Sequence, residues 1–167
     1  PGTNILAVDR NRKAESIFWT IEDRDYKGVM RKVINAKSET VHFVPMFKNA
    51  FIHGRVLIPA TGFYEWKDLP DKRKEKYEFE MDEPLFAFAG ISRECEIKGE
   101  TRNCGVILTT EANDVVRPIH AKGRMPVILH KQDYEKWLDP ETPAAELKDL
   151  MQPLPNNEIT AKPAEEK

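Results

Sequence analysis

The chain has 167 residues, of which 40% are hydrophobic and 32% charged, and its formal net charge is −2. This length fits one domain with a substantial core, and no apolar run approaches the roughly 20 residues that cross a bilayer, which excludes a membrane-spanning segment. The slightly negative charge excludes nucleic-acid binding by bulk electrostatics, so such binding would need a local basic groove.

The first ten residues contain neither an initiator Met nor the basic and then apolar order of a secretory signal. We therefore expect a cytoplasmic protein, associated with the nucleoid if it is bacterial, and a segment upstream of Pro1 that is missing from this sequence. The sequence has no cysteine and histidine spacing typical of a metal site. We expect a monomer with no metal and no cofactor.

Six short runs rich in β-branched, aromatic and aliphatic residues predict strands. Proline, glycine and charged residues separate these runs, which is typical of a sheet-rich domain. The predicted strands are residues 4–8, 16–21, 55–59, 76–80, 85–91 and 105–109.

Helices are predicted at three places between and after the strands. Residues 45–54 carry apolar side chains at helical spacing, and Gly54 is placed to end the helix. A shorter helix is predicted at residues 132–138. Thr142 followed by Pro143 is a good helix start, and the apolar stripe that follows is Leu147, Leu150 and Met151.

Together these elements predict one α+β domain over residues 1–151. We expect antiparallel strands to dominate it and to curl into a barrel-like core with a few helices packed outside. The charged run at residues 67–76 indicates a solvated hairpin loop. Residues 152–167 are rich in proline, asparagine, glutamate and lysine, and we expect them to form a loosely ordered tail.

The two cysteines, Cys95 and Cys104, flank a polar stretch as two strands of one hairpin would. A chain of this size does not need a disulfide, and intracellular thiols usually stay reduced. We favour two free structural thiols, with a disulfide as the alternative.

Glu65 is the first candidate for chemistry, because it lies among aromatic residues. In an extended chain Phe63 and Glu65 point to one face, and Tyr64 and Trp66 to the other. Desolvation by such neighbours raises the pKa of a carboxyl toward the neutral range that a general acid or base needs. The alternative is an edge-strand glutamate that faces water.

Other polar and aromatic residues could serve the same site or could be structural. His120 precedes a loop with Lys122 and Arg124, a setting that suits contact with phosphate, although many histidines are satisfied structural residues. The amide of Asn35 could hold a substrate carbonyl or a turn. Trp19 belongs either to the core or to a surface on which bases stack.

Five short motifs follow one another along the chain. They are Pro1-Gly2-Thr3, Phe18-Trp19, Asn35-Ala36-Lys37-Ser38-Glu39-Thr40, Gly62-Phe63-Tyr64-Glu65-Trp66, and His120 with Arg124-Met125-Pro126-Val127-Ile128-Leu129. Their order resembles the SRAP family, the SOS-response-associated peptidase-like proteins that handle abasic sites in single-stranded DNA. The Gly62 to Trp66 segment is identical to the commonest family form, and the last motif has a short insertion after its histidine.

The resemblance implies a covalent reaction with DNA. In that family the residue after the initiator Met is a cysteine, which self-processing exposes as the new N-terminus. Its amine forms a Schiff base with the ring-opened abasic sugar, and its thiol closes a thiazolidine. An α-amino group has a pKa of roughly 7.7–8.0, so a useful fraction is nucleophilic at neutral pH.

By the same resemblance, Asn35, Glu65 and His120 line the site. Glu65 would move protons at the amine and the sugar, and His120 would act on the sugar oxygen; both would also serve reversal and any strand-cleaving lyase activity. The residues expected to bind DNA are Lys37, Lys122, Arg124 and Trp19.

Three departures from the family pattern stand out. The family's Met-Cys-Gly-Arg start and the stretch before Pro1 are absent, and neither Cys95 nor Cys104 replaces that cysteine. Lys37 stands where the family usually has an arginine, which keeps the charge but loses the bidentate geometry. Residues 20–25 are more acidic than the family's segment.

We therefore expect a protein that recognises and covalently captures abasic sites in single-stranded DNA during the DNA damage response. Two alternatives remain open. One is a thiol autopeptidase or hydrolase that acts on protein, with Glu65 and His120 assisting an absent cysteine. The other is a noncatalytic single-stranded-DNA-binding relic.

Overall fold

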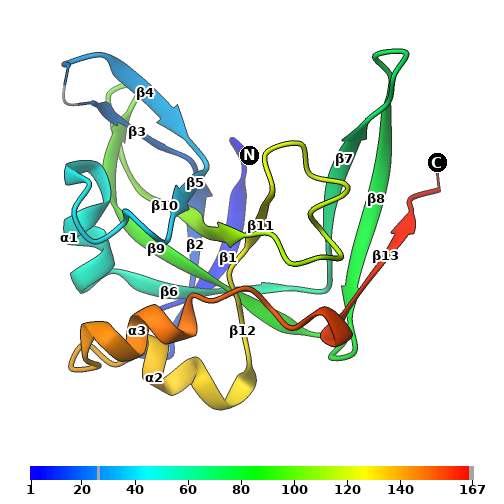
Figure 1. Ribbon diagram of the computed structural model, residues 1–167. Helices are drawn as coiled ribbons and strands as arrows, with labels where there is room; N and C mark the ends of the chain where they lie inside the picture. Colours follow the sequence, from blue (N-terminus) through cyan, green and yellow to red (C-terminus); the bar gives the residue numbers. More distant parts are fainter. Residues whose placement is uncertain (26, 166–167) are drawn as a thin grey trace.

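The computed structural model describes residues 1–25 and 27–165, and its centre is a closed ring of strands (Figure 1). The pairing order is β10-β2-β1-β6-β9, and β9 pairs again with β10 to close the ring. Only the β2–β10 pair in this ring is parallel. The predicted barrel-like core of antiparallel strands is confirmed. Its strands are β1 (Asn4–Val8), β2 (Ala14–Trp19), β6 (Arg55–Ala60), β9 (Phe86–Ile97) and β10 (Glu100–Glu111).

Short strands β11 (Arg124–Pro126) and β12 (Ile128–Leu129) fill the place where β9 and β10 separate. Val127, between them, donates its N–H to the Leu108 carbonyl at 2.8 Å and accepts the Ala89 N–H at 2.9 Å. These two bonds join the β11–β12 segment to both β10 and β9. The loop of residues 112–123 therefore starts and ends on fixed strands.

A further strand, β5 (Asn35–Lys37), pairs in parallel with β10, which sets Asn35 opposite Ile107 and Lys37 opposite Thr109. Before it, β3 (Ile21–Arg24) and β4 (Met30–Val33) form a hairpin. The predicted strand at residues 16–21 is thus divided. At the break, the N–H of Thr20 bonds back to the Phe18 carbonyl at 2.8 Å, a tight turn that propensity alone does not reveal.

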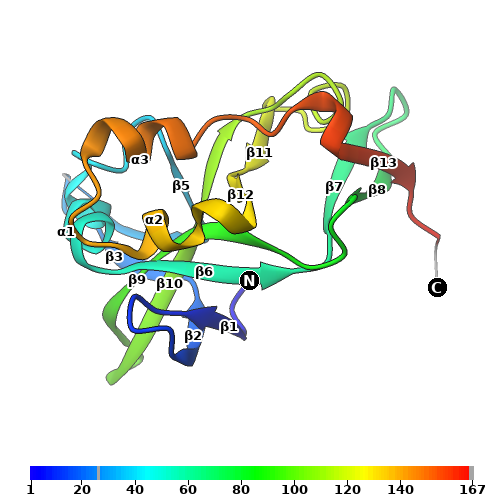
Figure 2. The ribbon, with the colours of Figure 1, turned by 90° about the horizontal axis from the view of Figure 1, so that it is seen from below.

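A second sheet of order β13-β8-β7 projects from the ring as an arm. It consists of β7 (Phe63–Asp68), β8 (Lys74–Met81) and β13 (Ile159–Pro163). As predicted, the charged run forms the exposed end of the β7–β8 hairpin. Figure 2 shows the arm and the helices at opposite ends of the molecule.

The expectation of a loosely ordered tail is wrong for residues 152–165. A 3-10 turn, η2 (Asn156–Glu158), leads into β13, which pairs with β8. The side chains of Leu154 and Ile159 are buried. The composition of this segment did not predict strand β13, because its partner strand β8 is distant in the sequence. Residues 166–167 lie outside the described residues.

The helices cover one side of the ring, and their predicted positions are confirmed. The 3-10 turn η1 (Lys131–Asp133) precedes α2, and buried Phe51, Trp137 and Leu147 pack these helices on the sheet. None of the helices within the described ranges has the length and apolar character that crossing a bilayer requires. The α-helices are α1 (Pro45–His53), α2 (Tyr134–Leu138) and α3 (Ala144–Leu150).

Buried Arg55 ties two helices to β6. Its Nε donates to the Trp137 carbonyl at 2.7 Å and its Nη1 to the Phe51 carbonyl at 2.8 Å. Carbonyls in the last turn of a helix lack helical partners and carry negative partial charge, so a guanidinium satisfies them. This end of the ring is therefore a rigid support, and the groove described below lies away from it.

Candidate active site

Glu65 is held on β7 with its side chain turned inward. Phe63, two residues earlier on the same face, stacks on Phe79 with ring centroids 4.7 Å apart, whereas Tyr64 and Trp66 on the other face are exposed. The predicted alternation is confirmed. The Glu65 side chain is 23% exposed, and burial raises the pKa of its carboxyl to about 7, against a smaller lowering effect of the Trp66 backbone N–H.

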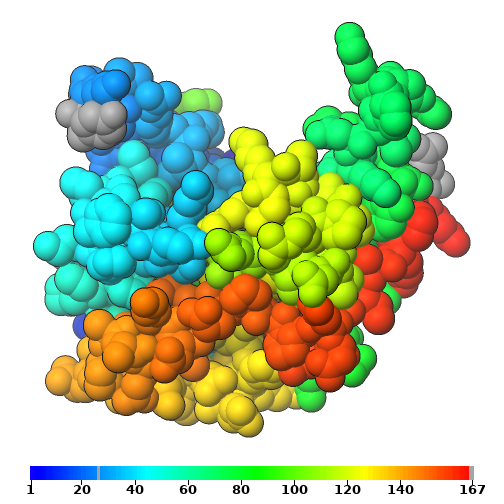
Figure 3. All heavy atoms as spheres, in the orientation of Figure 1, coloured from blue at the N-terminus to red at the C-terminus, as the bar shows by residue number. Residues whose placement is uncertain are grey.

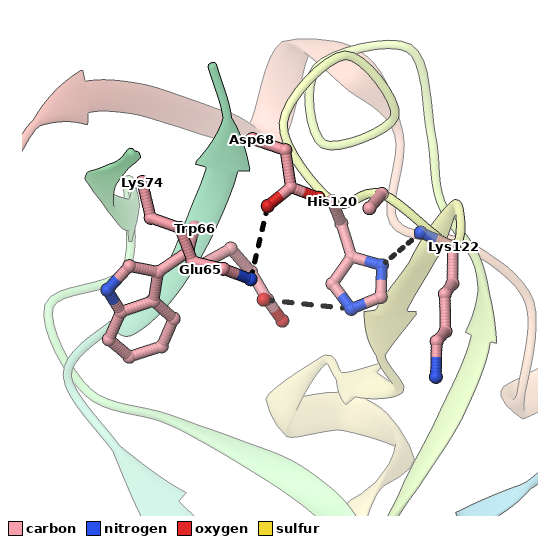
Figure 4. Close-up of a pocket in the computed structure, with 7 residues that line it drawn as sticks. Glu65, Trp66, Asp68, Lys74, His120 and Lys122 are labelled. Carbon is pink, nitrogen blue, oxygen red and sulfur yellow. Dashed lines mark hydrogen bonds and ion pairs between the residues drawn. The ribbon is translucent and has the colours of Figure 1, made fainter. Parts of the chain in front are cut away.

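His120 faces Glu65 from the loop of residues 112–123, with its Nε2 3.7 Å from Glu65 Oε2 (Figure 4). Its Nδ1 accepts the backbone N–H groups of Lys122 at 3.3 Å and Arg124 at 3.2 Å. A ring nitrogen that accepts is unprotonated, so neutral His120 carries its proton on Nε2. Nε2 is the nitrogen that faces Glu65.

The charge of His120 follows from its surroundings. Burial lowers the pKa of the imidazole, and the charges of Lys122 and Arg124 lower it further. His120 is therefore neutral at neutral pH, where Glu65 exchanges its proton. A carboxyl that gains and loses a proton near pH 7, beside an N–H donor of fixed direction, is suited to general acid-base chemistry.

The loop that carries His120 is anchored by Asn113. Its Oδ1 accepts the N–H groups of Val115 at 3.2 Å and Val116 at 3.0 Å, and its Nδ2 donates to the Leu154 carbonyl at 2.8 Å. Leu154 belongs to the segment that was expected to be loose. The C-terminal segment therefore helps to position His120.

A groove of about 940 Å³ opens beside the Glu65–His120 pair. In Figure 3 the surface is hollowed between the yellow loop and the green arm. The groove brings together all seven residues that the sequence nominated, and Pro1 also lines it. Those residues are Trp19, Asn35, Lys37, Glu65, His120, Lys122 and Arg124.

Comparison with known protein families classifies the chain. Over residues 1–167 the sequence matches the family described as SOS response associated peptidase (SRAP). The chain belongs to the SRAP family. The resemblance drawn from the motifs is confirmed by this match, which spans both the groove and the elements that support it.

Relatives of this SRAP chain include the abasic site processing protein YoqW of Bacillus subtilis (strain 168), 33% identical over 170 residues that cover 96% of this chain and 75% of YoqW. The abasic site processing protein YedK of Escherichia coli (strain K12) is 29% identical, over 90% of this chain and 67% of YedK. A crystal structure of a protein from Bacteroides thetaiotaomicron has a TM-score of 0.87 and 26% identity, and covers 98% of this chain and 75% of that one.

Among the basic residues of the SRAP groove, Arg124 is already paired. Its Nη1 and Nη2 donate to the two carboxylate oxygens of Glu39 at 2.7 and 2.9 Å, and Nη2 also reaches the Thr109 carbonyl at 2.8 Å. The side chain is only 17% exposed. The exposed cations of the groove are therefore Lys37 and Lys122.

Trp19 lines the groove as a fixed wall. Its indole Nε1 donates to the Ile34 carbonyl at 2.9 Å, which ties β2 to the residue just before Asn35. The ring is only half-buried. Trp19 is thus anchored by its indole N–H and also lines the groove, and a role in base stacking stays a prediction.

Sequence reasoning did not nominate Tyr64 and Trp66 as binding residues, although both line the groove. Their side chains are 46% and 47% exposed, and the Lys76 Nζ lies 3.8 Å from the centre of the Tyr64 ring. The strand alternation that turned Glu65 inward was the available signal, because it turns these two aromatic rings toward solvent.

Cys95 and Cys104 lie on neighbouring strands of the β9–β10 hairpin, and both are free and buried. The prediction of free thiols is confirmed. The pKa of the Cys104 thiol is raised to about 12, mainly by burial and secondly by the contact with Cys95. Only a thiolate is a good nucleophile, so Cys104 is inert at neutral pH.

Proposed function

We propose that this SRAP protein recognises abasic sites in single-stranded DNA and processes them at Glu65 and His120. The observation that carries the proposal is the desolvated Glu65–His120 pair at the edge of the groove, 3.7 Å apart. The relatives YoqW and YedK are named abasic site processing proteins, which supports the same substrate.

The walls of the groove suit a single strand. Apolar side chains and the exposed rings of Tyr64 and Trp66 offer surfaces on which bases stack, while Lys37 and Lys122 can meet phosphates. Proteins commonly hold single-stranded nucleic acid with this combination of aromatic rings and local positive charge. A local basic groove also reconciles DNA binding with a chain whose formal net charge is −2.

Each member of the pair has a distinct role in the proposed chemistry. The Nε2–H of His120 donates a hydrogen bond to the sugar oxygen and favours the ring-opened aldehyde. Protonated Glu65 gives its proton to the hydroxyl of the carbinolamine, which leaves as water when the Schiff base forms. The carboxylate that remains accepts the proton of the thiol that adds in the next step. The amide of Asn35 orients the sugar.

The covalent form of the proposal uses an N-terminal cysteine. Its amine forms the protonated Schiff base with the aldehyde carbon, and its thiolate then adds to the same carbon to close a thiazolidine, whose nitrogen keeps its one proton. Pro1 lines the groove, so a segment joined to Pro1 would start there. Proline has no thiol, so Pro1 cannot replace this cysteine.

Denaturing gel electrophoresis tests this form. The chain that begins at Pro1 and a form that begins Met-Cys-Gly-Arg are each mixed with abasic single-stranded DNA, without a reducing agent. We expect a heat-stable shifted band from the cysteine form alone. Such a band from the chain that begins at Pro1 would place the nucleophile elsewhere, and no band from either protein would contradict covalent capture.

A Glu65→Gln variant of the cysteine form tests the role of the carboxyl. Glutamine has nearly the same shape but cannot exchange a proton, so the adduct should form about 10²–10⁴-fold more slowly. Wild-type rates in this variant across the pH range would reduce Glu65 to a structural residue.

A further inference from the structure

A second, smaller pocket of about 360 Å³ lies at the same pair of residues. Four residues line both this pocket and the large groove, so the two hollows adjoin at Glu65 and His120. The shared residues are Glu65, Trp66, His120 and Lys122. Figure 4 shows the pocket between the arm and the loop that carries His120.

The residues that belong to the smaller pocket alone include an ion pair on the arm. Lys74 Nζ lies 3.1 Å from Asp68 Oδ1, and the two side chains are 61% and 56% exposed. Ion pairs between side chains this exposed contribute little to stability. Lys74 can therefore exchange Asp68 for another anion at small cost.

The position of this pair relates it to the path of a DNA strand. In the proposed function, an abasic nucleotide at Glu65 and His120 has a phosphate on each side. On one side the strand lies in the large groove, where Lys37 is exposed. The smaller pocket adjoins the other side of that position, and Lys74 and Lys122 are the two lysines that line it.

We propose that the smaller pocket is an exit subsite for the single strand, in which Lys74 leaves Asp68 and binds the phosphate next to the abasic nucleotide. Asp68 then acts as a competitor that holds Lys74 when no DNA is present. This inference rests on the proposed function, because it takes the position of the abasic sugar from it.

The test measures the affinity of wild type, Lys74→Gln, Asp68→Asn and the double variant for a fluorescent single-stranded oligonucleotide with one tetrahydrofuran abasic analogue. Lys74→Gln should weaken binding several-fold and reduce the salt slope by about 0.7, the value for one phosphate contact in single strands. Asp68→Asn should tighten binding several-fold, and should have no effect once Lys74 is replaced.

Lys72→Gln is the matched control, since it removes the same charge from the same arm at a residue that does not line the pocket. An effect as large as that of Lys74→Gln would show that general charge on the arm matters, and would overturn the proposal. An Asp68→Asn effect that persists without Lys74 would overturn it as well.

Truncated strands locate the phosphate. Two oligonucleotides end at the tetrahydrofuran, one on its 5′ side and one on its 3′ side. Lys74→Gln should lose its effect on one of them, because the phosphate that Lys74 binds is missing. If both retain the full effect, the exit subsite is wrong. If wild type shows no preference for the abasic oligonucleotide over an undamaged one, the proposed function itself fails.

Discussion

His120 presents its Nε2 to Glu65 Oε2 at 3.7 Å while its Nδ1 accepts two backbone N–H groups. The loop thereby fixes both the direction and the protonation of the imidazole. In the proposed reaction His120 donates to the sugar oxygen, and Glu65, whose pKa is raised to about 7, exchanges protons near neutral pH.

Two substitutions at His120 separate these roles. In His120→Asn, the side-chain oxygen can replace Nδ1 as acceptor for the loop, but nothing replaces the Nε2–H. We expect normal folding and a loss of the preference for abasic DNA. His120→Gln can restore a donor near the position of Nε2 but loses the acceptor at Nδ1. Its melting temperature should therefore be lower than that of His120→Asn. Thermal melts and binding assays check both, and equal preference in wild type and His120→Asn would contradict the assignment.

The raised pKa of Glu65 makes stability depend on pH. The folded carboxyl has a pKa of about 7 against an ordinary value of 4.5, because burial penalises the charged form. Below pH 4.5 the carboxyl is neutral in both the folded and the unfolded protein, so it does not affect stability. Above pH 7 it is charged in both, and the cost of burying the charge destabilises the folded protein by on the order of 3 kcal/mol.

Glu65→Gln removes that penalty. Its melting temperature relative to wild type should therefore rise as the pH increases from 4.5 to 8. Thermal melts of both proteins in matched buffers give the answer. A difference that is constant with pH would mean that the Glu65 carboxyl is not desolvated.

Lys37 and Arg124 should behave differently when neutralised. Lys37 is exposed, so Lys37→Gln should lower the salt slope of single-strand binding by about 0.7 without changing the melting temperature. Arg124 holds Glu39 in a bidentate pair, so Arg124→Gln should lower the melting temperature and change the slope less. If Arg124→Gln flattened the slope and left stability unchanged, the Glu39 pair would have no structural role.

The two cysteines should resist alkylation in the folded protein. Cys104 is 0% exposed and Cys95 is 5% exposed, and the pKa of the Cys104 thiol is raised to about 12. Mass spectrometry after iodoacetamide at pH 8 should find no adduct in native buffer and two adducts in guanidinium. Fast modification of the native protein would contradict this and make the two thiols candidate nucleophiles.

Local patterns predicted much of this structure. Short runs of β-branched, aromatic and aliphatic residues located the five strands of the ring and β8. The alternation along β7 turned Glu65 inward opposite Tyr64 and Trp66. The helical spacing at residues 45–54 predicted α1. These features depend on neighbours in the sequence, which a single chain displays directly.

Features that depend on distant residues were missed. The parallel pairing of β2 with β10, the strand β13 on β8 and the pairing of Arg124 with Glu39 each join parts far apart in the chain. The proximity of Asn35, Glu65 and His120 was expected from the family resemblance alone. No local pattern contains it, because β5, β7 and the loop before β11 lie close together only in the folded protein.

The most direct test of the account is the ratio of two affinities of this chain, for a single strand with one tetrahydrofuran and for the same strand undamaged. The account predicts tighter binding of the abasic strand by wild type, and loss of that preference in Asn35→Ala and His120→Asn. Lys37→Gln should weaken binding to both strands equally, since it acts on phosphate. Equal affinities in wild type, or a preference that survives both site variants, would contradict the assignment of this groove to abasic DNA.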